Sequence, residues 1–409
     1  MSETVQYLRE YLKSDPTHQA VEAGELVRRI LIDAITADAS DIHIEPWESS
    51  LCVRIRCNGV LQELVHLPLE FMDKIFGVFK VKAQLVTYQN DLPQEGHVPG
   101  EADLGGVEQR VSIFPTARGG KIVVRLFDPS NRSFDLNTLG FDDETLLATK
   151  KLLTKPSGLL LLTGPTGSGK TTAMYSALCY IYGKHGSTIS MASVEDPVEF
   201  NLQMIAQAQV NNVKGFTYPV ALRSLMRQDP QVIMIGEIRD AETAQIAVQA
   251  GLTGHLVIST IHSGSTAGVF ARMINMNIEP FLLASSIIGV LGTRLVRRNC
   301  PDCRVEYSPD DAFLRMLPRE DLTNATFMMG GGCGNCFSTG FSGRTAVTEM
   351  LVADQVFRDA VMQKMSTRNL QQVAVNQGMR TLWDNGVRRA MTGESPLEEI
   401  LRVISFDDM

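Results

Sequence analysis

The chain has 409 residues, enough for two domains and a small third module. Hydrophobic residues make up 44% of it and charged residues 21%, as in an ordinary globular protein. The formal net charge of −8 argues against a protein that mainly coats nucleic acid, so we expect no nucleic-acid partner.

The sequence predicts no targeting or membrane-spanning segment. Residues 1–10 are polar and mixed in charge, so we expect no signal peptide. The longest apolar run, 281–291, is shorter than the ~18 residues that a bilayer span needs. We therefore expect a cytoplasmic protein, unless a partner recruits it to a membrane.

The first part of the chain predicts an α+β domain over residues 21–127, after an N-terminal extension at 1–20 that includes a short helix. Apolar residues at helical spacing predict a buried amphipathic helix over 21–37. Alternating apolar residues over 41–65, interrupted by Asn58 and Gly59, predict a β-hairpin. The remaining elements are a helix at 71–85, a loop or hairpin at 92–106, and strands at 109–114 and 121–127.

A segment rich in Pro, Ser and Asn at 128–135 is the predicted linker to a second domain, 136–409. In this domain apolar strands alternate with helices, which indicates a parallel sheet covered on both faces, and hence an α/β fold. We expect strands at 159–162, 187–194, 232–235 and 256–260. The helices between them are expected at 172–182, 219–226 and 241–251, and further helices at 350–409.

One stretch between a predicted strand and a predicted helix, GPTGSGKT at 164–171, fits the phosphate-binding loop G-x-x-x-x-G-K-[ST]. Its glycines let backbone N–H groups converge on phosphate oxygens, Lys170 supplies a cation, and the Thr171 hydroxyl can ligate Mg²⁺. A chance match is expected in on the order of 1% of chains of this length. We predict that a nucleotide is bound by Gly164, Pro165, Thr166, Gly167, Ser168, Gly169, Lys170, Thr171 and Thr172.

Carboxylates follow two of the predicted strands. Glu237 ends the apolar run 232–235, where an acid can hold the Mg²⁺ shell or orient the attacking water. Glu195, Asp196 and Glu199 follow the strand at 187–194. A polar exit from the strand is the alternative interpretation of these three acids.

Two histidines, His255 and His262, bracket the strand predicted at 256–260. Histidines at strand ends are commonly satisfied by backbone groups, but the number of polar strand ends in this sheet favours a place near the nucleotide. Three arginines near the same edge could stabilise phosphate charge or form surface ion pairs; they are Arg223, Arg227 and Arg239.

Two C-x-x-C pairs near the C-terminal end predict a metal site. Cys300 and Cys303 form the first pair, and Cys333 and Cys336 form the second. Two such turns present four thiolates to Zn²⁺ tetrahedrally. Unligated buried cysteines and a redox pair are the alternatives; the redox pair is disfavoured because neither C-x-x-C opens a thioredoxin-like helix. We assign this small zinc module to 296–345, within the second domain.

With these motifs in place, the chain resembles the type II secretion and type IV pilus assembly ATPase family. The resemblance covers about residues 21–405. It is carried by ASDIHIEP at 39–46, the strands at 110–125, an acidic box at 195–199, an extended Walker B signature at 222–243 and a histidine box at 253–262.

The resemblance implies a RecA-like ATPase domain and a PAS-like N-terminal domain that clamp ATP between them. It also implies a homohexameric ring at the cytoplasmic face of the inner membrane, recruited there by a platform protein of a pilus or secretion system. The four-cysteine module is typical of the family's assembly and secretion motors.

The resemblance further implies roles for single residues. Glu237 and Glu199 are candidates to polarise the attacking water, and Glu195 and Asp196 would lie around Mg²⁺. Two histidines would lie near the γ-phosphate, and two arginines of the N-terminal domain would reach the nucleotide; they are His255, His262, Arg110 and Arg125.

The sequence departs from the family pattern at three places. Asn58 replaces a common Asp, His97 a usual arginine, and Gly292-Thr293 a usual Ala-Gln. We expect none of them to touch the phosphate-binding residues, and these departures therefore to affect coupling rather than hydrolysis.

The function expected is an ATP-hydrolysing motor that powers assembly of a type IV pilus or a type II secretion pseudopilus. A retraction motor is the first alternative, favoured by the short N-terminal extension and disfavoured by the four cysteines. A DNA-processing RecA-like ATPase and a scaffold that binds ATP without hydrolysing it are the others. Acidic net charge disfavours the former, and intact Glu237 and Glu199 disfavour the latter.

Overall fold

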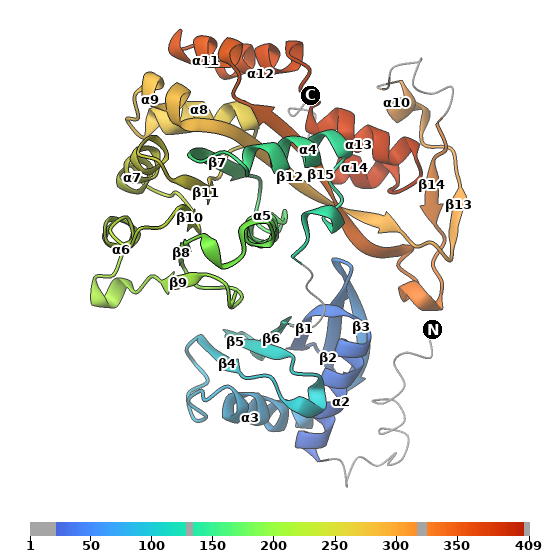
Figure 1. The fold of residues 1–409 in the computed structure, drawn as a ribbon. Helices are drawn as coiled ribbons and strands as arrows, with labels where there is room; N and C mark the ends of the chain where they lie inside the picture. The colour runs from blue at the N-terminus through green and yellow to red at the C-terminus, as the bar shows by residue number, and fades with distance from the viewer. Residues whose placement is uncertain (1–21, 128–133, 316, 318–324, 405–409) are drawn as a thin grey trace. The chain divides into compact units, whose positions relative to one another are not determined.

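The structure, a computed structural model, describes residues 22–127, 134–315, 317 and 325–404. The predicted extension at 1–20 and most of the predicted linker at 128–135 lie outside these ranges. The described residues form two compact units (Figure 1). Unit 1 comprises 22–127 together with Asn299–Val305 and Met329–Gly343, and unit 2 comprises the rest.

Unit 1 is an α+β unit built on a six-stranded sheet in the order β3-β2-β1-β6-β5-β4, in which neighbouring strands pair antiparallel. Its helices α2 (Ala23–Thr36) and α3 (Met72–Lys82) pack with the sheet around one apolar core. The strands are β1 (Ala39–Pro46), β2 (Leu51–Cys57), β3 (Val60–Leu67), β4 (Gln94–Val98), β5 (Glu108–Thr116) and β6 (Gly119–Phe127).

The sequence predicted both helices and the last two strands of this unit, but it indicated a single hairpin over 41–65 where the structure has the three strands β1, β2 and β3. The β2–β3 hairpin turns at Asn58 and Gly59, whose φ angles of 51° and 79° are both positive, as a two-residue type I′ turn requires. The stretch predicted as loop or hairpin at 92–106 contains the short edge strand β4. The PAS-like identity of this unit remains a prediction.

Unit 2 contains a seven-stranded sheet in the order β15-β12-β7-β11-β10-β8-β9, and the pairs from β12 to β9 are parallel. The α/β fold with a parallel sheet is therefore confirmed. The strands are β7 (Gly158–Thr163), β8 (Met191–Glu195), β9 (Ala206–Gln209), β10 (Val232–Ile235), β11 (Leu256–Thr260), β12 (Ile287–Asn299) and β15 (Phe341–Val352).

Helices lie on both faces of this sheet (Figure 1). The longer ones are α4 (Asp143–Leu152), α5 (Lys170–His185), α6 (Tyr218–Leu225), α7 (Ala241–Leu252), α8 (Thr266–Asn275) and α9 (Pro280–Ser286). The C-terminal part adds α11 (Gln355–Met362), α12 (Thr367–Asn376), α13 (Leu382–Met391) and α14 (Leu397–Val403). Two small strands, β13 (Arg304–Glu306) and β14 (Met328–Gly330), pair with each other, and α10 (Asp311–Leu314) lies between them in the chain.

Strand β7 is apolar throughout because each of its two faces has its own core. Leu159 and Leu161 pack into the core formed with α6, α7, α8 and α9. Leu160 and Leu162 pack into the core formed with α4 and α5. Side chains alternate between the faces of a strand, so a strand covered on both sides needs an unbroken apolar run.

The apolar run at 281–291 is not one element. Its first part belongs to the seven-residue helix α9 and its second part to the buried strand β12. Among the described residues, no helix has the length and apolar character needed to cross a membrane.

Candidate functional site

A cleft of about 510 Å³ opens in unit 2 where β7, β8 and β10 end and the phosphate-binding loop begins. Carboxyl ends of parallel strands meet at one edge of a sheet, so residues that follow different strands converge here. The cleft is lined by Thr166, Gly167, Gly169, Lys170, Thr171, Thr172, Met174, Glu195, Asp196, Pro197, Glu199, Tyr218, Met234, Gly236, Glu237, Arg239, Thr260, His262, Leu295 and Arg344.

The loop at 164–171 requires glycine at its entry. A Cβ on Gly164 would lie 2.5 Å from the Thr293 carbonyl oxygen and 2.6 Å from Ser168 Oγ. Gly169 is the N-cap of α5, and its φ angle of 92° lies in the left-handed region, which residues with a side chain adopt only at a cost in free energy. The loop therefore delivers its N–H groups and the positive end of α5 into the cleft.

Lys170 folds back onto the loop that carries it. Its Nζ donates to the carbonyl oxygens of Gly164 at 2.7 Å and Pro165 at 2.8 Å. Burial lowers the pKa of Lys170, while the nearby Glu237 carboxylate works to raise it. Two carbonyl oxygens of the loop thus hold the ammonium group at the wall of the cleft.

Glu237 sits between two groups at the carboxyl edge. Arg239 Nε donates to Glu237 Oε2 at 2.8 Å, and His262 Nε2 lies 3.2 Å from Glu237 Oε1. The hydrogen bond and charge of Glu237 raise the pKa of Arg239. Only 19% of the Glu237 side chain is exposed, so these contacts hold its carboxylate in one orientation at the mouth of the cleft.

The Glu195 carboxylate is buried and its oxygens are held by neighbouring side chains. Ser193 Oγ and Gln207 Nε2 donate to Oε1 at 2.5 and 2.9 Å, and the Tyr175 hydroxyl donates to Oε2. Burial and this bond raise the pKa of Tyr175. Glu195 therefore lines the cleft as a carboxyl group held in one orientation rather than as a side chain free to turn toward a ligand.

The other two acids of this stretch also line the cleft. Asp196 Oδ2 lies 3.6 Å from an Arg239 nitrogen, which connects Asp196 to the Glu237 pair. Glu199 joins them in the lining. Every acid that the sequence assigned to the site is thus brought to one cleft.

The two histidines lie at opposite ends of β11. His262 follows the strand and reaches Glu237, whereas His255 precedes it. The His255 carbonyl oxygen accepts from Gly158 N at the start of β7, and its ring Nδ1 lies 3.1 Å from the Ala250 carbonyl oxygen. His255 is therefore not brought to the phosphate edge of its own chain, because a residue before a parallel strand falls at the amino edge of the sheet.

Several residues of the cleft had no sequence signal. Arg344, on β15, adds a cation from a strand far along the chain, and Tyr218 opens α6 against the acids. Thr293 Oγ1 lies 3.2 Å from Ser168 Oγ of the loop. The expectation that the departures from the family pattern stay clear of the phosphate-binding residues is therefore wrong for Thr293.

The two arginines expected to reach the nucleotide belong to unit 1. Arg110 and Arg125 are direct partners in the β5–β6 ladder. The Arg110 guanidinium lies 4.9 Å from the centre of the Phe127 ring, and Arg125 Nε donates to Asp41 Oδ1 at 3.1 Å. The structure places them side by side on one sheet, and their role toward a nucleotide remains a prediction.

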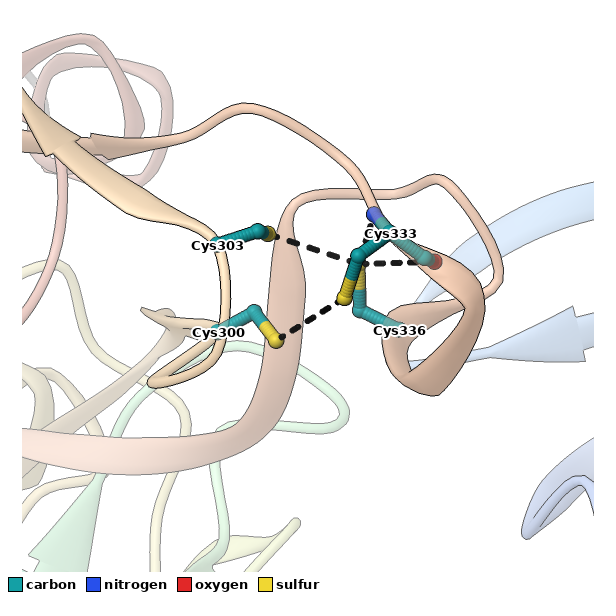
Figure 2. Close-up of side chains that lie close together, drawn as sticks. All are labelled: Cys300, Cys303, Cys333 and Cys336. Carbon is teal, nitrogen blue, oxygen red and sulfur yellow. Dashed lines mark hydrogen bonds between the residues drawn. The ribbon is translucent and has the colours of Figure 1, made fainter.

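The four cysteines of the C-x-x-C pairs form one cluster (Figure 2). The Sγ atoms lie 3.9 Å apart between Cys300 and Cys333, 3.8 Å between Cys303 and Cys336, and 3.7 Å between Cys333 and Cys336. Tetrahedral Zn²⁺ with Zn–S bonds of about 2.3 Å needs sulfur atoms about 3.8 Å apart. The four side chains fit this ion.

Backbone N–H groups surround the sulfur atoms. Gly332 N donates to Cys303 Sγ at 3.3 Å, and Cys333 N and Gly340 N donate to Cys336 Sγ at 3.1 and 3.2 Å. Burial works to raise the pKa of Cys336, but the two backbone bonds to its sulfur, together with hydrogen bonds from the Cys333 and Cys303 thiols, outweigh it and bring the pKa to about 7. Burial raises the pKa of Cys303 to about 12 in spite of the bond from Gly332. Such donors stabilise thiolates, the form that binds a metal.

The cysteine segments group with unit 1, whereas the sequence assigned 296–345 to the ATPase domain. Asn58, in the β2–β3 turn, donates to the Phe341 carbonyl oxygen at 3.2 Å and accepts from Gly343 N at 2.8 Å. Gln62 donates to the Phe337 carbonyl oxygen at 2.9 Å, and the Phe337 side chain packs against the core of unit 1. An amide at position 58 can make both bonds, whereas an aspartate could not donate.

Comparison with known proteins gives a consistent result. The family model described as "Type II/IV secretion system protein" matches residues 17–402. The chain is 41% identical to the type IV pilus assembly ATPase PilB of Myxococcus xanthus, over 92% of this chain and 67% of the relative. It is 40% identical to the type II secretion system protein E of Pseudomonas aeruginosa, over 92% of this chain and 74% of the relative.

Solved structures share the fold at lower sequence identity. The ATPase DotB of Legionella pneumophila has a TM-score of 0.67 at 19% identity, covering 92% of this chain and 94% of DotB. The pilus retraction motor PilT, solved with bound ADP, has a TM-score of 0.63 at 22% identity, covering 93% of this chain and 96% of PilT.

Proposed function

The chain belongs to the type II/IV secretion system protein family, and we propose that it is a motor that hydrolyses ATP to power assembly of a type IV pilus or a type II secretion pseudopilus. The observation that carries this proposal is the cleft in unit 2. There a phosphate-binding loop, its lysine and a carboxylate fixed by His262 and Arg239 face the same space.

In the proposed reaction, the loop and Lys170 bind the β- and γ-phosphates of ATP. Thr171 and Asp196 would hold Mg²⁺, with the Glu195 carboxyl group beside them, and the bound ion would supply positive charge that offsets the charge developing on the phosphates. Water then attacks the γ-phosphorus and the bond from this phosphorus to the bridging oxygen breaks; ADP and inorganic phosphate leave, and the proton lost by the water passes to solvent.

Glu237 is the acid that we assign to orient the attacking water, with Glu199 as the alternative. The contacts of Glu237 support this assignment: both oxygens have partners, so the carboxylate is positioned before ATP arrives. His262 beside it can donate to the charge that forms on the γ-phosphate.

Assembly is proposed over retraction because the relatives at about 40% identity are named for pilus assembly and type II secretion. The similarity to the retraction motor PilT, at 22% identity, shows a shared fold and does not favour retraction. We further propose a homohexamer of RecA-like domains with PAS-like N-terminal domains, located at the cytoplasmic face of the inner membrane. A platform protein of the pilus or secretion system would recruit it there.

The four-cysteine cluster is proposed to hold one structural Zn²⁺. Its donor set is closed, with four thiolates and no position for water, as in structural rather than catalytic zinc sites. The ion would fix the segments around Cys300 and Cys333 that group with unit 1.

The proposal is tested by two measurements on the full-length protein. Purified protein should release phosphate from ATP only with Mg²⁺, and Lys170→Ala should abolish the release. In a host that lacks its own assembly ATPase, the parent chain should restore pili or secretion, and Lys170→Ala should not. Mg²⁺-independent or absent phosphate release, with folded protein, would refute the enzymatic part of the proposal.

A further inference from the structure

The β2–β3 hairpin of unit 1 carries a second group of metal-ligating side chains, which shares no residue with the four-cysteine cluster. Cys52 lies on β2, and Glu63 and His66 lie on β3. One ligand atom from each of the three lies within 4.8 Å of the others. The proposed motor function does not use any of them.

A β-bulge brings the three side chains to one face. Cys52 pairs directly with His66, and Val53 pairs with Val65, but Arg54 pairs with Glu63, so that Leu64 is an extra residue in β3. A bulge of this kind places residues three apart on the same face of a strand. Leu64 and Leu67 are accordingly buried, while Glu63 and His66 are exposed on the other face, where Cys52 lies beneath them.

The surroundings orient His66 as a ligand. Ser50 Oγ lies 2.9 Å from His66 Nδ1, and Glu63 Oε2 lies 3.4 Å from His66 Nε2. In the tautomer that carries its proton on Nδ1, His66 donates to Ser50, and the lone pair of Nε2 faces Glu63. Metal-bound histidines usually donate their second ring nitrogen in this way.

The chemistry of the donor set selects the ion. One thiolate, one carboxylate and one imidazole are the ligands that Zn²⁺ takes, and three protein ligands leave the fourth tetrahedral position to water. The thiolate and the carboxylate together neutralise a divalent cation. Ligand atoms of such a site lie about 3.3–3.8 Å apart, and the exposed side chains of Glu63 and His66, at 58% and 41%, can rotate to reach that spacing.

We propose that Cys52, Glu63 and His66 form a second zinc site, which holds the bulge of β3 against β2 on the surface of unit 1. On binding, Zn²⁺ displaces the thiol proton of Cys52 to solvent. The buried thiolate anchors the ion, and the two exposed ligands make it exchangeable, in contrast to the closed four-cysteine cluster.

A tryptophan next to the site offers a readout independent of ATP hydrolysis. The Trp47 and His66 rings pack edge to face, with centroids 5.2 Å apart. The sequence has two tryptophans, and the other one, Trp383, belongs to unit 2. In a Trp383→Phe background, Co²⁺ bound in place of Zn²⁺ should quench the emission of Trp47.

The experiment measures zinc content and Co²⁺ quenching on the full-length protein. The parent should hold about two zinc ions per chain at saturation, one for each cluster. Cys52→Ser, and Glu63→Gln with its exposed side chain, should each hold about one. Cys179→Ser, which removes a thiol outside both clusters, should still hold two, and Ser50→Ala should weaken Co²⁺ binding about 10–100-fold.

Two results would overturn the proposal. One is a parent that holds only one zinc ion per chain at saturation, or a zinc content that is unchanged in folded Glu63→Gln and Cys52→Ser; either would remove these residues as ligands of a second ion. The other is quenching of Trp47 by Co²⁺ that is equal in parent and His66→Gln. Because Glu63 is exposed, Glu63→Gln keeps the test decisive even if Cys52→Ser fails to fold.

Discussion

Replacing Glu237 by glutamine tests the assignment on which the proposed chemistry rests. The amide keeps the shape of the side chain but removes its charge. The amide oxygen of glutamine can still accept one hydrogen bond. Its NH₂ group cannot accept a hydrogen bond from Arg239, and the neutral amide cannot attract an attacking water as a carboxylate does. The change is therefore expected to act on the reaction far more than on the fold.

The structure allows the effect of this change on stability and its effect on the reaction rate to be estimated separately. The partners of Glu237 are well exposed, 58% for the Arg239 side chain and 46% for that of His262. Partly screened pairs of this kind contribute about 1 kcal/mol or less to stability, so the Tm should fall by no more than about 4 °C. Loss of a positioned acid or base slows a reaction about 10²–10⁴-fold, equivalent to about 3–5 kcal/mol of barrier.

The assay compares phosphate release, ATP affinity and Tm in parent and Glu237→Gln. Glu242→Gln is the matched control: Glu242 is 56% exposed and pairs with Arg223, so the same charge is lost outside the cleft. The control should retain turnover within about twofold. Turnover of Glu237→Gln within about threefold of the parent, at saturating ATP, would refute the assigned role and direct attention to Glu199.

Four further outcomes are expected. Lys170→Ala should weaken binding of a fluorescent ATP analogue and abolish turnover, because its ammonium group is the cation at the phosphate position; retained affinity would contradict the loop geometry. Cys336→Ser should remove the zinc of the four-cysteine cluster, measured by elemental analysis, while ATP affinity stays within about twofold; a parent without zinc would end that assignment. The buried Glu399 has a lowered pKa because hydrogen bonds from Arg402 and Arg297 outweigh its burial. The carboxylate therefore stabilises the fold above its unfolded-state pKa of 4.5, and this stabilisation is lost as the pH falls through its folded-state pKa. Glu399→Gln should therefore lower the free energy of unfolding by about 1.5–3 kcal/mol at pH 7, measured by denaturant titration. The difference between variant and parent should narrow below pH 4.5, and a constant difference would refute this reasoning. Arg110→Ala should lower turnover in the phosphate-release assay, because we propose that its guanidinium contacts the bound nucleotide; turnover equal to that of the parent would leave Arg125 as the candidate.

Local motifs were predictable because their geometry depends on residues that are neighbours in the chain. The loop at 164–171 needs glycines, a lysine and a helix start in sequence, and the structure has Gly164, Lys170 and α5 in these places. The apolar run of β7 predicted a strand covered on both faces. The spacing of the C-x-x-C pairs likewise predicted the four-cysteine cluster.

The direction of strand β11 explains why only one of the two histidines that flank it lies in the cleft. Both histidines of the 256–260 strand looked equivalent as flanking residues, yet His262 reaches Glu237 and His255 does not. In a parallel sheet only the carboxyl ends face the loop, so the direction of β11 decides between them. This signal was present in the sequence once the strand was located.

What the sequence by itself determined is thus the strands and helices around the phosphate-binding loop, the loop itself and the cysteine pairs, each specified by short-range spacing. Only the tertiary structure decided which distant residues share a site. Tyr175 and Gln207 fix Glu195, Arg344 enters the cleft from β15, and Asn58 joins the cysteine segments to unit 1. These contacts depend on strand order and on packing between elements far apart in the chain. No local periodicity records such contacts, because a side chain can form them only after the sheet has assembled.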